Sequence, residues 1–455
     1  MTFRSVTQQK IVLAIGDIFI IILSLNMAFF LRLHRSIISY LGLYEAVLTV
    51  LLLLFIYLTC FYIIDLYNTR ENFRSFRFVG QVLGSFVLIV LVSVGLFYIF
   101  PYIIGRGVFL ISFFLSFVLV IIWRLFFSIF FSLTFRSRNV LLVGIDKPTE
   151  ILDSIFSENP EYQAVGIIEG DLNNDFNFGF KVLGDPSSLE KIAGEYNIDD
   201  IVIIRSMKNL QLDKALVNCR MKGICVYDLP RFYELTMGKL PISYMKEKWF
   251  LYSNGFGKLR SKVYKRMKRS IDLLVGFLLF VCFFPLGLLV SLCIKLNSRG
   301  PIFYIQERVG EDQKLFRLFK FRTMVVDAEK GEPKWAEEND PRVTKVGKIL
   351  RKTRLDEWPQ LLNVIRGEMS LVGPRPEREY FIRKLEETIP FYSLRFSVKP
   401  GLTGWAQVNY PYGSSAEDAL EKLQYDLYYI KNMSLLLDFR ILLKTARTIL
   451  FWKGR

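Results

Sequence analysis

The chain has 455 residues, of which 52% are hydrophobic and 22% are charged, a composition that argues against intrinsic disorder and against a highly charged coiled coil. Its formal net charge of +16 suits nucleic acid, anionic lipid or phosphorylated substrates, and charge alone does not choose among them. One histidine, His34, and five cysteines without a Cys-x-x-Cys pair argue against a histidine-rich zinc site, a Ser-His-Asp triad and a disulfide framework.

Four long apolar runs occupy the first third of the chain. A membrane-spanning helix needs ~20 consecutive, mostly apolar residues. The runs of about this length cover residues 11–31, 43–64, 79–100 and 108–131. The first run is too long for the apolar part of a cleaved signal peptide, and no small-residue cleavage site follows it. We therefore predict four transmembrane helices within residues 1–135.

Lysine and arginine residues in the short loops orient these helices, because such residues are enriched on the cytoplasmic side. One set of loops carries Arg4, Lys10, Arg70, Arg74, Arg77, Arg136 and Arg138. The opposite set carries only Arg32, Arg35 and Arg106. This bias places the N-terminus and everything after residue 135 in the cytoplasm.

Two charged residues, Asp17 and Arg124, lie inside apolar runs. We interpret them as residues that face the interior of the helix bundle or extend to the membrane surface. A functional role for charges inside the membrane is the alternative.

Residues 136–257 read as a small α/β domain. Buried-strand patterns at residues 139–144, 165–168, 200–204 and 223–227 alternate with helical patterns, which predicts a parallel, Rossmann-like sheet. A dinucleotide site needs the glycines of a G-x-G-x-x-G turn, and only Gly144 is present after the first strand. We therefore expect a non-catalytic scaffold or regulatory module.

A fifth apolar run, residues 271–296, has basic residues on both sides and Pro285 near its centre. Both flanks favour the cytoplasm, and proline kinks a helix. We infer a re-entrant helix that enters and leaves the membrane on one face. An ordinary kinked transmembrane helix, which would put the last third of the chain outside, is the alternative.

The last third of the chain carries the chemistry. Asp356 and Glu357 open a short helix whose dipole favours ionised carboxylates, and an ionised Asp is a competent nucleophile; a plain helix cap is the alternative. Arg375 lies between two prolines on a stiff loop and could hold a phosphate, or it could simply pack. Lys320 and Arg322 would share one face of a strand, where they could bind phosphate or face solvent.

Taken in order, these segments resemble one family from about residue 258 to the C-terminus. The matching motifs are Lys268-Arg269-x-x-Asp272, Lys320-Phe321-Arg322-Thr323-Met324, Leu355-Asp356-Glu357-x-Pro359-Gln360, Val372-Gly373-Pro374-Arg375-Pro376-Glu377 and Lys399-Pro400-Gly401-x-Thr403-Gly404-Trp405. The set resembles the bacterial polyprenol-phosphate phosphoglycosyl transferases. The whole chain is similar in architecture to their large form, with four N-terminal helices, a Rossmann-like middle domain and a mostly helical catalytic domain, here residues 258–455. Trp358 departs from the family, which often has leucine there.

The resemblance implies a two-step mechanism. Asp356 would attack the sugar-bearing phosphorus of a UDP-sugar, release UMP and hold a covalent phosphosugar, which undecaprenyl phosphate would then accept. Glu357 would assist by proton transfer or by orienting Mg²⁺, with Mn²⁺ as an alternative, and both carboxylates would bind the metal. The remaining roles implied are phosphate binding by Arg375, Lys320 and Arg322, substrate contacts by Gln360, Asn363 and Thr403, and support of the re-entrant helix by Pro285, Arg269 and Asp272.

The resemblance also implies a cellular setting. The protein would be a homodimer in the bacterial inner membrane, with its catalytic domain on the cytoplasmic face, and would start exopolysaccharide or O-antigen assembly by transferring a hexose-1-phosphate. Residues 435–452 read as a basic amphipathic helix on the membrane, or as a packed domain helix with a solvated basic face. No nucleic-acid partner is expected. The alternatives are a membrane-anchored NAD-dependent sugar-nucleotide dehydratase or epimerase, and a non-enzymatic scaffold of a polysaccharide export system.

Overall fold

The computed structural model describes most of the chain. The described residues are 6–69, 73, 75–99, 105–132, 137–144, 149–169, 180–204, 210–245, 247–326, 340–411, 413 and 415–451. Four arginines used above to orient the helices lie outside them: Arg4, Arg70, Arg74 and Arg136. The chain divides into two compact units, Met1–Asp228 and Leu229–Arg455, and each is described by itself.

The first unit begins with long apolar helices that coincide with the four expected runs. They are α1 (Val6–Leu33), α3 (Leu43–Ile64), α4 (Phe76–Ile99) and α5 (Arg106–Ser132), with the short α2 (Ile37–Leu41) between the first two. Each of the four is long and apolar enough to cross a membrane. Phe29, Phe61, Phe86 and Phe127 belong to the apolar cluster that packs these helices together. These helices are typical of a membrane protein.

The two charges inside the apolar runs pair with each other. Arg124 Nη2 donates to Asp17 Oδ2 over 2.8 Å, and both side chains are fully buried. The guanidinium also lies over the ring of Tyr67, 5.5 Å from its centroid. The interpretation that Asp17 and Arg124 face the bundle interior is therefore confirmed for this pair.

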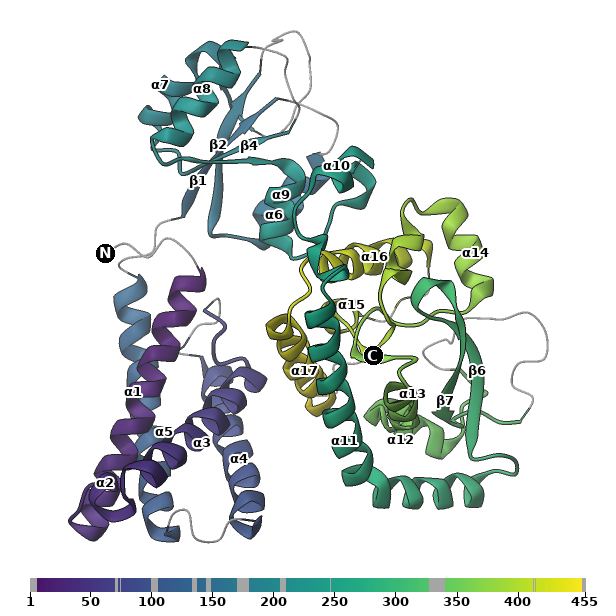
Figure 1. Ribbon diagram of the computed structural model, residues 1–455. Helices are drawn as coiled ribbons and strands as arrows, with labels where there is room; N and C mark the ends of the chain where they lie inside the picture. Colours follow the sequence, from purple (N-terminus) through teal and green to yellow (C-terminus); the bar gives the residue numbers. More distant parts are fainter. Residues whose placement is uncertain are drawn as a thin grey trace. The chain divides into compact units, whose positions relative to one another are not determined.

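A parallel sheet forms the rest of the first unit (Figure 1). The strands are β1 (Arg138–Val143), β2 (Tyr162–Ile168), β3 (Val182–Gly184), β4 (Asp200–Ile203) and β5 (Cys225–Asp228), and the helices are α6 (Thr149–Glu158), α7 (Leu189–Glu195) and α8 (Leu210–Met221). The strand order β3-β2-β1-β4-β5 is that of a Rossmann-type sheet, so the predicted fold of this segment is confirmed. Gly144 ends β1 with a φ of +79°, and residues 145–148 lie outside the described residues.

The second unit begins at Leu229, whereas the sequence suggests a catalytic domain from about residue 258. Helix α9 (Leu229–Met237) supplies Glu234, which accepts hydrogen bonds from Lys431 Nζ at 2.7 Å and Asn432 Nδ2 at 2.9 Å. The Trp405 indole donates to the carbonyl of Gly238 over 2.8 Å. These buried polar contacts attach the segment after β5 to the C-terminal helices.

The core of the second unit combines short strands and helices. The elements are α10 (Glu247–Tyr252), α11 (Lys262–Asn297), β6 (Phe303–Val309), β7 (Leu315–Phe321), α12 (Lys345–Thr353), α13 (Leu361–Arg366), β8 (Ser370–Val372), α14 (Glu379–Thr388), β9 (Gly401–Thr403), α15 (Trp405–Asn409), α16 (Ala416–Lys431) and α17 (Leu435–Leu450). Strands β6 and β7 form an antiparallel hairpin, and β8 pairs with β9 in parallel. The described part of this unit is thus mostly helical.

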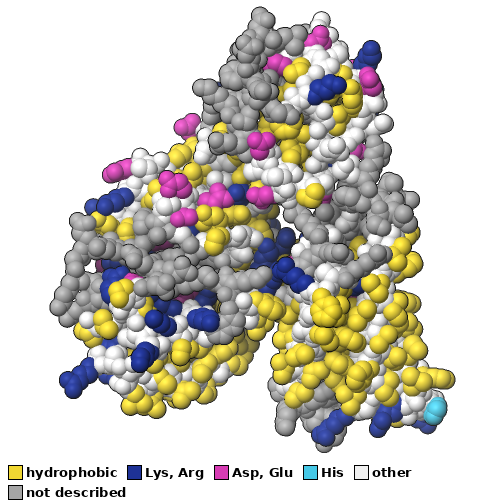
Figure 2. All heavy atoms as spheres, turned by 180° about the vertical axis from the view of Figure 1, so that it is seen from behind, with side chains coloured by type: hydrophobic (Ala, Val, Ile, Leu, Met, Phe, Trp, Pro, Cys, Tyr) yellow, Lys and Arg dark blue, Asp and Glu magenta, His cyan; other side chains and the backbone are white. Residues whose placement is uncertain are grey.

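Helix α11 is one continuous helix with Pro285 inside it. Figure 1 shows that it bends sharply between its two halves, as expected where proline removes a backbone hydrogen bond. Apolar side chains on both halves, such as Leu274, Phe277, Leu288 and Leu292, are exposed. Figure 2 shows hydrophobic side chains gathered over each unit, with Lys and Arg side chains beside them on the second.

Helix α17 exposes apolar as well as basic side chains. Lys444 Nζ lies 4.7 Å and the Arg440 guanidinium 5.5 Å from the centroid of the Trp405 ring; Lys444 is half-buried, whereas Arg440 is exposed. Leu436, Phe439 and Leu450 are exposed as well. The basic face of α17 is therefore only partly solvated: the Trp405 ring attracts the Lys444 ammonium group inward, while Arg440 stays exposed as expected. Residue 452, the last residue of the expected helix, lies outside the described residues.

The Glu234–Lys431 pair generates a stability prediction. Lys431→Met should destabilise the second unit by roughly 3 kcal/mol, because removing one partner leaves a buried charge poorly compensated. Lys431→Met combined with Glu234→Gln should recover most of this loss. Thermal unfolding of the purified protein measures both changes. Arg383→Met, which breaks an exposed pair with Glu379, is the control and should change the Tm little. Equal Tm values for the single and double variants would contradict the prediction.

Candidate active site

The two neighbouring carboxylates Asp356 and Glu357 lie in a tight turn between α12 and α13. Arg354 adopts a left-handed conformation with a φ of +55°, which ends α12 and starts the 3-10 helix Leu355–Gln360. Glu357 is buried within this segment, and Asp356 is half-buried. The short helix predicted to carry the pair is therefore two segments, a 3-10 turn followed by α13 (Leu361–Arg366).

Two cations surround Glu357. Arg375 Nη2 donates to Glu357 Oε1 over 2.6 Å, and Lys320 Nζ lies 3.7 Å from the same oxygen. Burial alone would raise the pKa of Glu357, but Arg375 and Lys320 hold that pKa well below its ordinary range. Glu357 is therefore a permanently charged carboxylate between two cations.

Asp356 has a different environment from its neighbour. Burial and the charge of Glu357 raise the pKa of Asp356 to about 6, against the opposing effect of Lys320, Arg351 and Arg375. Its carboxylate takes no hydrogen bond or ion pair from the described part of the chain. The sequence argument used only the helix dipole and missed the effect of burial. With a pKa of about 6, most Asp356 side chains are still ionised at pH 7.

Lys320 is placed by Asn363. The buried Asn363 amide accepts from the Phe319 N–H at 3.2 Å and donates to the Arg317 carbonyl at 2.7 Å, so it ties β7 to α13. It also donates to Glu368 over 2.7 Å. These bonds use the Asn363 side chain inside the protein and favour a supporting role over the expected substrate contact.

Two other expected substrate contacts are also buried. Thr403 Oγ1 lies 2.6 Å from Thr445 Oγ1 and thereby links β9 to α17. Gln360 is buried at the end of the 3-10 helix. The structure brings Asp356, Glu357, Arg375 and Lys320 together, and places Asn363, Thr403 and Gln360 among the residues that support them.

Arg322 is engaged elsewhere. Its guanidinium donates to the carbonyl of Arg299 at 2.9 Å and to the carbonyl and hydroxyl of Ser298, each at 2.8 Å. These three hydrogen bonds fasten the end of β7 to the segment after α11. They favour a structural role for Arg322 over the phosphate contact suggested by its spacing from Lys320.

The loop that carries Arg375 is held by hydrogen bonds with the motif that contains Gly401 and Thr403. The Gly373 N–H donates to the Thr403 carbonyl at 2.9 Å, and the Gly401 N–H donates to the Pro374 carbonyl at 2.8 Å. A Cβ at Gly401 would lie 2.1 Å from the Gly373 nitrogen. Only glycine allows this close approach, which explains why the two motifs contain glycine where they meet.

Sequence reasoning assigned no role to Arg351, which lies in the last turn of α12. Arg351 Nε donates to Thr323 Oγ1 over 2.9 Å, and its charge lowers the pKa of Asp356. The sequence offers one signal that Arg351 belongs to the site. It lies five residues before Asp356, and its partner Thr323 lies inside the motif that contains Lys320. The site thus includes a further cation whose charge acts on Asp356.

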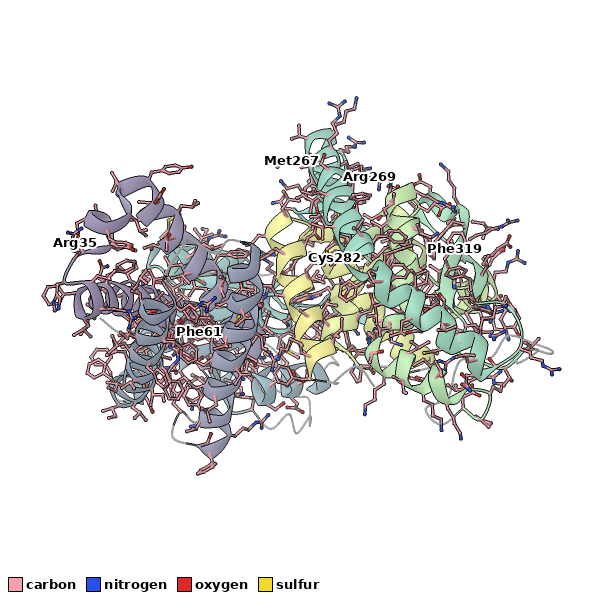
Figure 3. All side chains as sticks on the ribbon, turned by 90° about the horizontal axis from the view of Figure 1, so that it is seen from below. Arg35, Phe61, Met267, Arg269, Cys282 and Phe319 are labelled. Carbon is pink, nitrogen blue, oxygen red and sulfur yellow. The ribbon has the colours of Figure 1, made fainter. Side chains whose placement is uncertain are left out.

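Helix α11 is fastened directly to the segments that carry the site. Arg269 donates to the carbonyl of Ile365 at 2.7 Å and also to that of Val364, and so caps the C-terminal end of α13. Asp272 Oδ1 accepts from the Leu371 N–H at 3.0 Å. Figure 3 labels Arg269 on α11 and Phe319 on β7. The first half of α11 therefore sets the position of α13 and β8.

An aromatic stack makes a second connection between α11 and the site. The Trp358 ring stacks on Phe280 of α11 at 4.8 Å and on Phe321 of β7 at 5.8 Å, measured between ring centroids. Gly287 leaves room for this ring, because a Cβ there would lie 2.8 Å from Trp358 Cζ3. Because Trp358 directly follows Glu357 in the chain, the stack also holds the segment with both carboxylates in place beside α11.

The two carboxylates expected to bind a metal ion could do so only together with oxygen atoms of a bound substrate. No group of three or more His, Cys, Asp or Glu side chains among the described residues could hold a metal ion. Asp356 has no hydrogen-bond or ion-pair partner among the described residues, whereas Glu357 is occupied by Arg375 and Lys320. Mg²⁺ commonly binds one or two carboxylates together with substrate phosphates. Asp356 suits that arrangement.

Comparison with known proteins adds independent information. A family model described as bacterial sugar transferase matches residues 263–452, and one described as a CoA-binding domain matches residues 62–227. Residues 263–452 contain Asp356, Glu357, Arg375 and Lys320.

Three relatives illustrate the match. The chain is 42% identical over 239 residues to the UDP-N-acetylgalactosamine-undecaprenyl-phosphate N-acetylgalactosaminephosphotransferase of Aeromonas hydrophila, covering 52% of this chain and 55% of that one. It is 31% identical over 336 residues to the UDP-glucose:undecaprenyl-phosphate glucose-1-phosphate transferase of Xanthomonas campestris pv. campestris, covering 69% and 66%. It is 39% identical over 202 residues to the exopolysaccharide production protein ExoY of Sinorhizobium fredii, covering 41% and 87%. The chain thus spans about half the length of the Aeromonas relative.

The Trp358 stack generates a prediction with a matched control on the same helix. Gly287→Ala should lower the Tm of the purified protein, because the new methyl group displaces the Trp358 ring. Gly276→Ala places its Cβ 3.4 Å from Val364 Cγ1, an ordinary contact, and should be neutral or raise the Tm by improving helix propensity. Two variants with the same Tm would show that the ring does not limit the space at Gly287.

Proposed function

The chain belongs to the bacterial sugar transferase family, and from this we propose that it transfers a sugar-1-phosphate from a UDP-sugar to undecaprenyl phosphate and releases UMP. The observation that carries the proposal is the contrast between the two carboxylates. Asp356 is ionised and free of partners in the described part of the chain, and Glu357 is fixed between Arg375 and Lys320. A free nucleophile beside fixed cations suits attack on a phosphorus atom.

The chemistry proceeds in two displacements at one phosphorus atom. A carboxylate oxygen of Asp356 forms a bond to the sugar-bearing phosphorus, the bond from that phosphorus to the bridging oxygen breaks, and UMP leaves with the electron pair. A phosphate oxygen of undecaprenyl phosphate then attacks the same phosphorus and releases Asp356. The product is undecaprenyl diphosphate-sugar, and the Asp356 carboxylate is regenerated.

The cations of the site stabilise the charge that develops on the phosphate oxygens. Arg375 is held on a stiff loop and can present paired donors, while Lys320 is a point charge fixed by the β6–β7 hairpin. Glu357 orients both cations and offsets part of their positive charge. Bound Mg²⁺, or Mn²⁺ in its place, would neutralise diphosphate oxygens, with Asp356 as its protein ligand.

Helix α11 explains how a lipid and a soluble nucleotide can meet at this site. We take α11 as a re-entrant helix that keeps the second unit on the cytoplasmic face of the bacterial inner membrane, while α1, α3, α4 and α5 span it. Basic residues on both flanks of α11, its bend near Pro285 and its exposed apolar side chains support this arrangement. The product would start assembly of an exopolysaccharide or O-antigen chain.

The first test measures UMP release. Purified protein in nanodiscs, incubated with Mg²⁺, undecaprenyl phosphate and UDP-sugars, should release UMP with one donor. The panel includes UDP-glucose and UDP-N-acetylgalactosamine, which the names of two relatives specify. Asp356→Asn should lower the rate by at least about a thousandfold, because an amide is no substitute for the nucleophilic carboxylate. UMP release that survives in Asp356→Asn would reject this residue as the nucleophile. Bound NAD without UMP release would favour a dehydratase or epimerase.

The second test uses pH. The value of kcat/KM should fall below about pH 6, as Asp356 becomes protonated, and above about pH 8, as Lys320 loses its proton, since burial lowers the pKa of Lys320 to about 8. Lys320→Met removes a cation that lowers the pKa of Asp356, so the acid limb should move to higher pH and the alkaline limb should disappear. Lys348→Met, at an exposed lysine of α12, is the control and should keep both limbs. An unchanged acid limb in Lys320→Met would contradict the assigned electrostatics.

A further inference from the structure

The loop of residues 374–377 is held at every backbone carbonyl. Its donors come from three different segments of the second unit. They are the Gly401 N–H to Pro374 at 2.8 Å, Arg395 Nη2 to Arg375 at 3.0 Å, Arg308 Nη1 to Pro376 at 3.3 Å and the Val309 N–H to Glu377 at 3.0 Å. Two of the four donors are arginine side chains. A loop with two prolines cannot form a full strand ladder, so its carbonyls need such outside donors.

Arg395 is the more deeply placed of these two arginines. It lies in the 3-10 helix Tyr392–Ser397 and is only 6% exposed. Its Nη2 also donates to Asp426 Oδ2 of α16 over 2.8 Å, and its Nη1 donates to the Tyr392 hydroxyl. Arg395 therefore spans the distance between α16 and the backbone of the Arg375 loop.

A gain in stability does not by itself explain why the buried position beside the Arg375 loop holds the ion pair of Arg395 and Asp426. Apolar side chains of similar volume often give equal or greater stability than a buried pair, because taking two charges out of water is costly. Arg395 and Asp426 have side chains that are 7% and 2% exposed. An apolar pair could fill the same space, but it could not donate a hydrogen bond to the Arg375 carbonyl.

We propose that Arg395, held by Asp426, is a positioning residue that fixes the Arg375 loop so that the Arg375 guanidinium meets Glu357 and the substrate phosphate. The proposal rests on the proposed function for its catalytic consequence. Its structural part, the hold on the loop, stands on the hydrogen bonds alone. Arg395 makes no contact with substrate in this scheme, since it acts through the backbone of Arg375.

Two variants separate positioning from a contribution to stability. Arg395→Met leaves Asp426 without its partner and should lower the Tm. Arg395→Met combined with Asp426→Leu replaces the pair by apolar side chains and should restore most of the Tm. Neither variant can hold the Arg375 carbonyl. Both should therefore lose roughly 10- to 100-fold in kcat/KM for the UDP-sugar, the scale expected when a reacting group shifts by about an ångström.

Hydrogen–deuterium exchange of the full-length protein gives a readout that does not depend on activity. In the double variant, peptides covering residues 373–378 should exchange at least about tenfold faster than in the wild type, while the Tm stays near the wild-type value. Arg138→Met with Asp200→Leu is the matched control, because Arg138 and the buried Asp200 form a pair in the other unit with a 2.6 Å hydrogen bond. This control should change neither the exchange of the loop nor the activity.

The outcomes are distinguishable. Unchanged loop exchange in the double variant overturns the proposal, as does activity that returns together with the Tm. Faster loop exchange with lost activity at restored Tm supports it. If the wild type releases no UMP from any donor, the proposed function fails, and the exchange measurement still decides whether Arg395 holds the loop.

Discussion

The buried carboxylate of Glu357, held between Arg375 and Lys320, is the interaction on which the catalytic unit depends. A charge in this position is stable only if its cations are held at fixed distances, so the surrounding elements are arranged to hold them. Asn363 ties the strand of Lys320 to α13, the paired strands β8 and β9 hold the loop of Arg375, and Trp358 ties the carboxylates to α11. Among the described residues Asp356 has no hydrogen-bond or ion-pair partner, while its neighbour Glu357 pairs with both cations.

The parts of this arrangement that depend on local sequence could be predicted. Apolar runs predict the long helices, alternating patterns predict the parallel sheet, and a carboxylate pair with Arg375 and Lys320 can be recognised from short motifs. Arg351 and Arg395 could not be identified, because their roles depend on partners far along the chain that pack against them only in the fold. For the same reason, spacing alone suggested a phosphate contact for Arg322, whose partners are Ser298 and Arg299.

Burial and packing also explain two differences between the structure and what the sequence suggested. The pKa of Asp356 is raised although it lies near a helix start, because desolvation outweighs the dipole of a short 3-10 turn. Lys444 of α17 lies over the ring of the buried Trp405, because the face of an aromatic ring attracts a nearby ammonium group. Both effects arise from tertiary neighbours, which a residue pattern does not reveal. The segment after β5 likewise joins the second unit through Glu234, whose partner Lys431 is 197 residues away.

The ion pair inside the helix bundle has a consequence for how the chain is made. Asp17 and Arg124 are separated by 107 residues, and each fully buried charge has the other as its counter-ion. At a synthesis rate of ~5–20 residues per second, the ribosome completes α5 on the order of 5 to 20 s after α1. During that interval α1 carries a carboxylic acid without its counter-ion. The packing of these helices is therefore completed only when the last of them joins the first and supplies the missing charge.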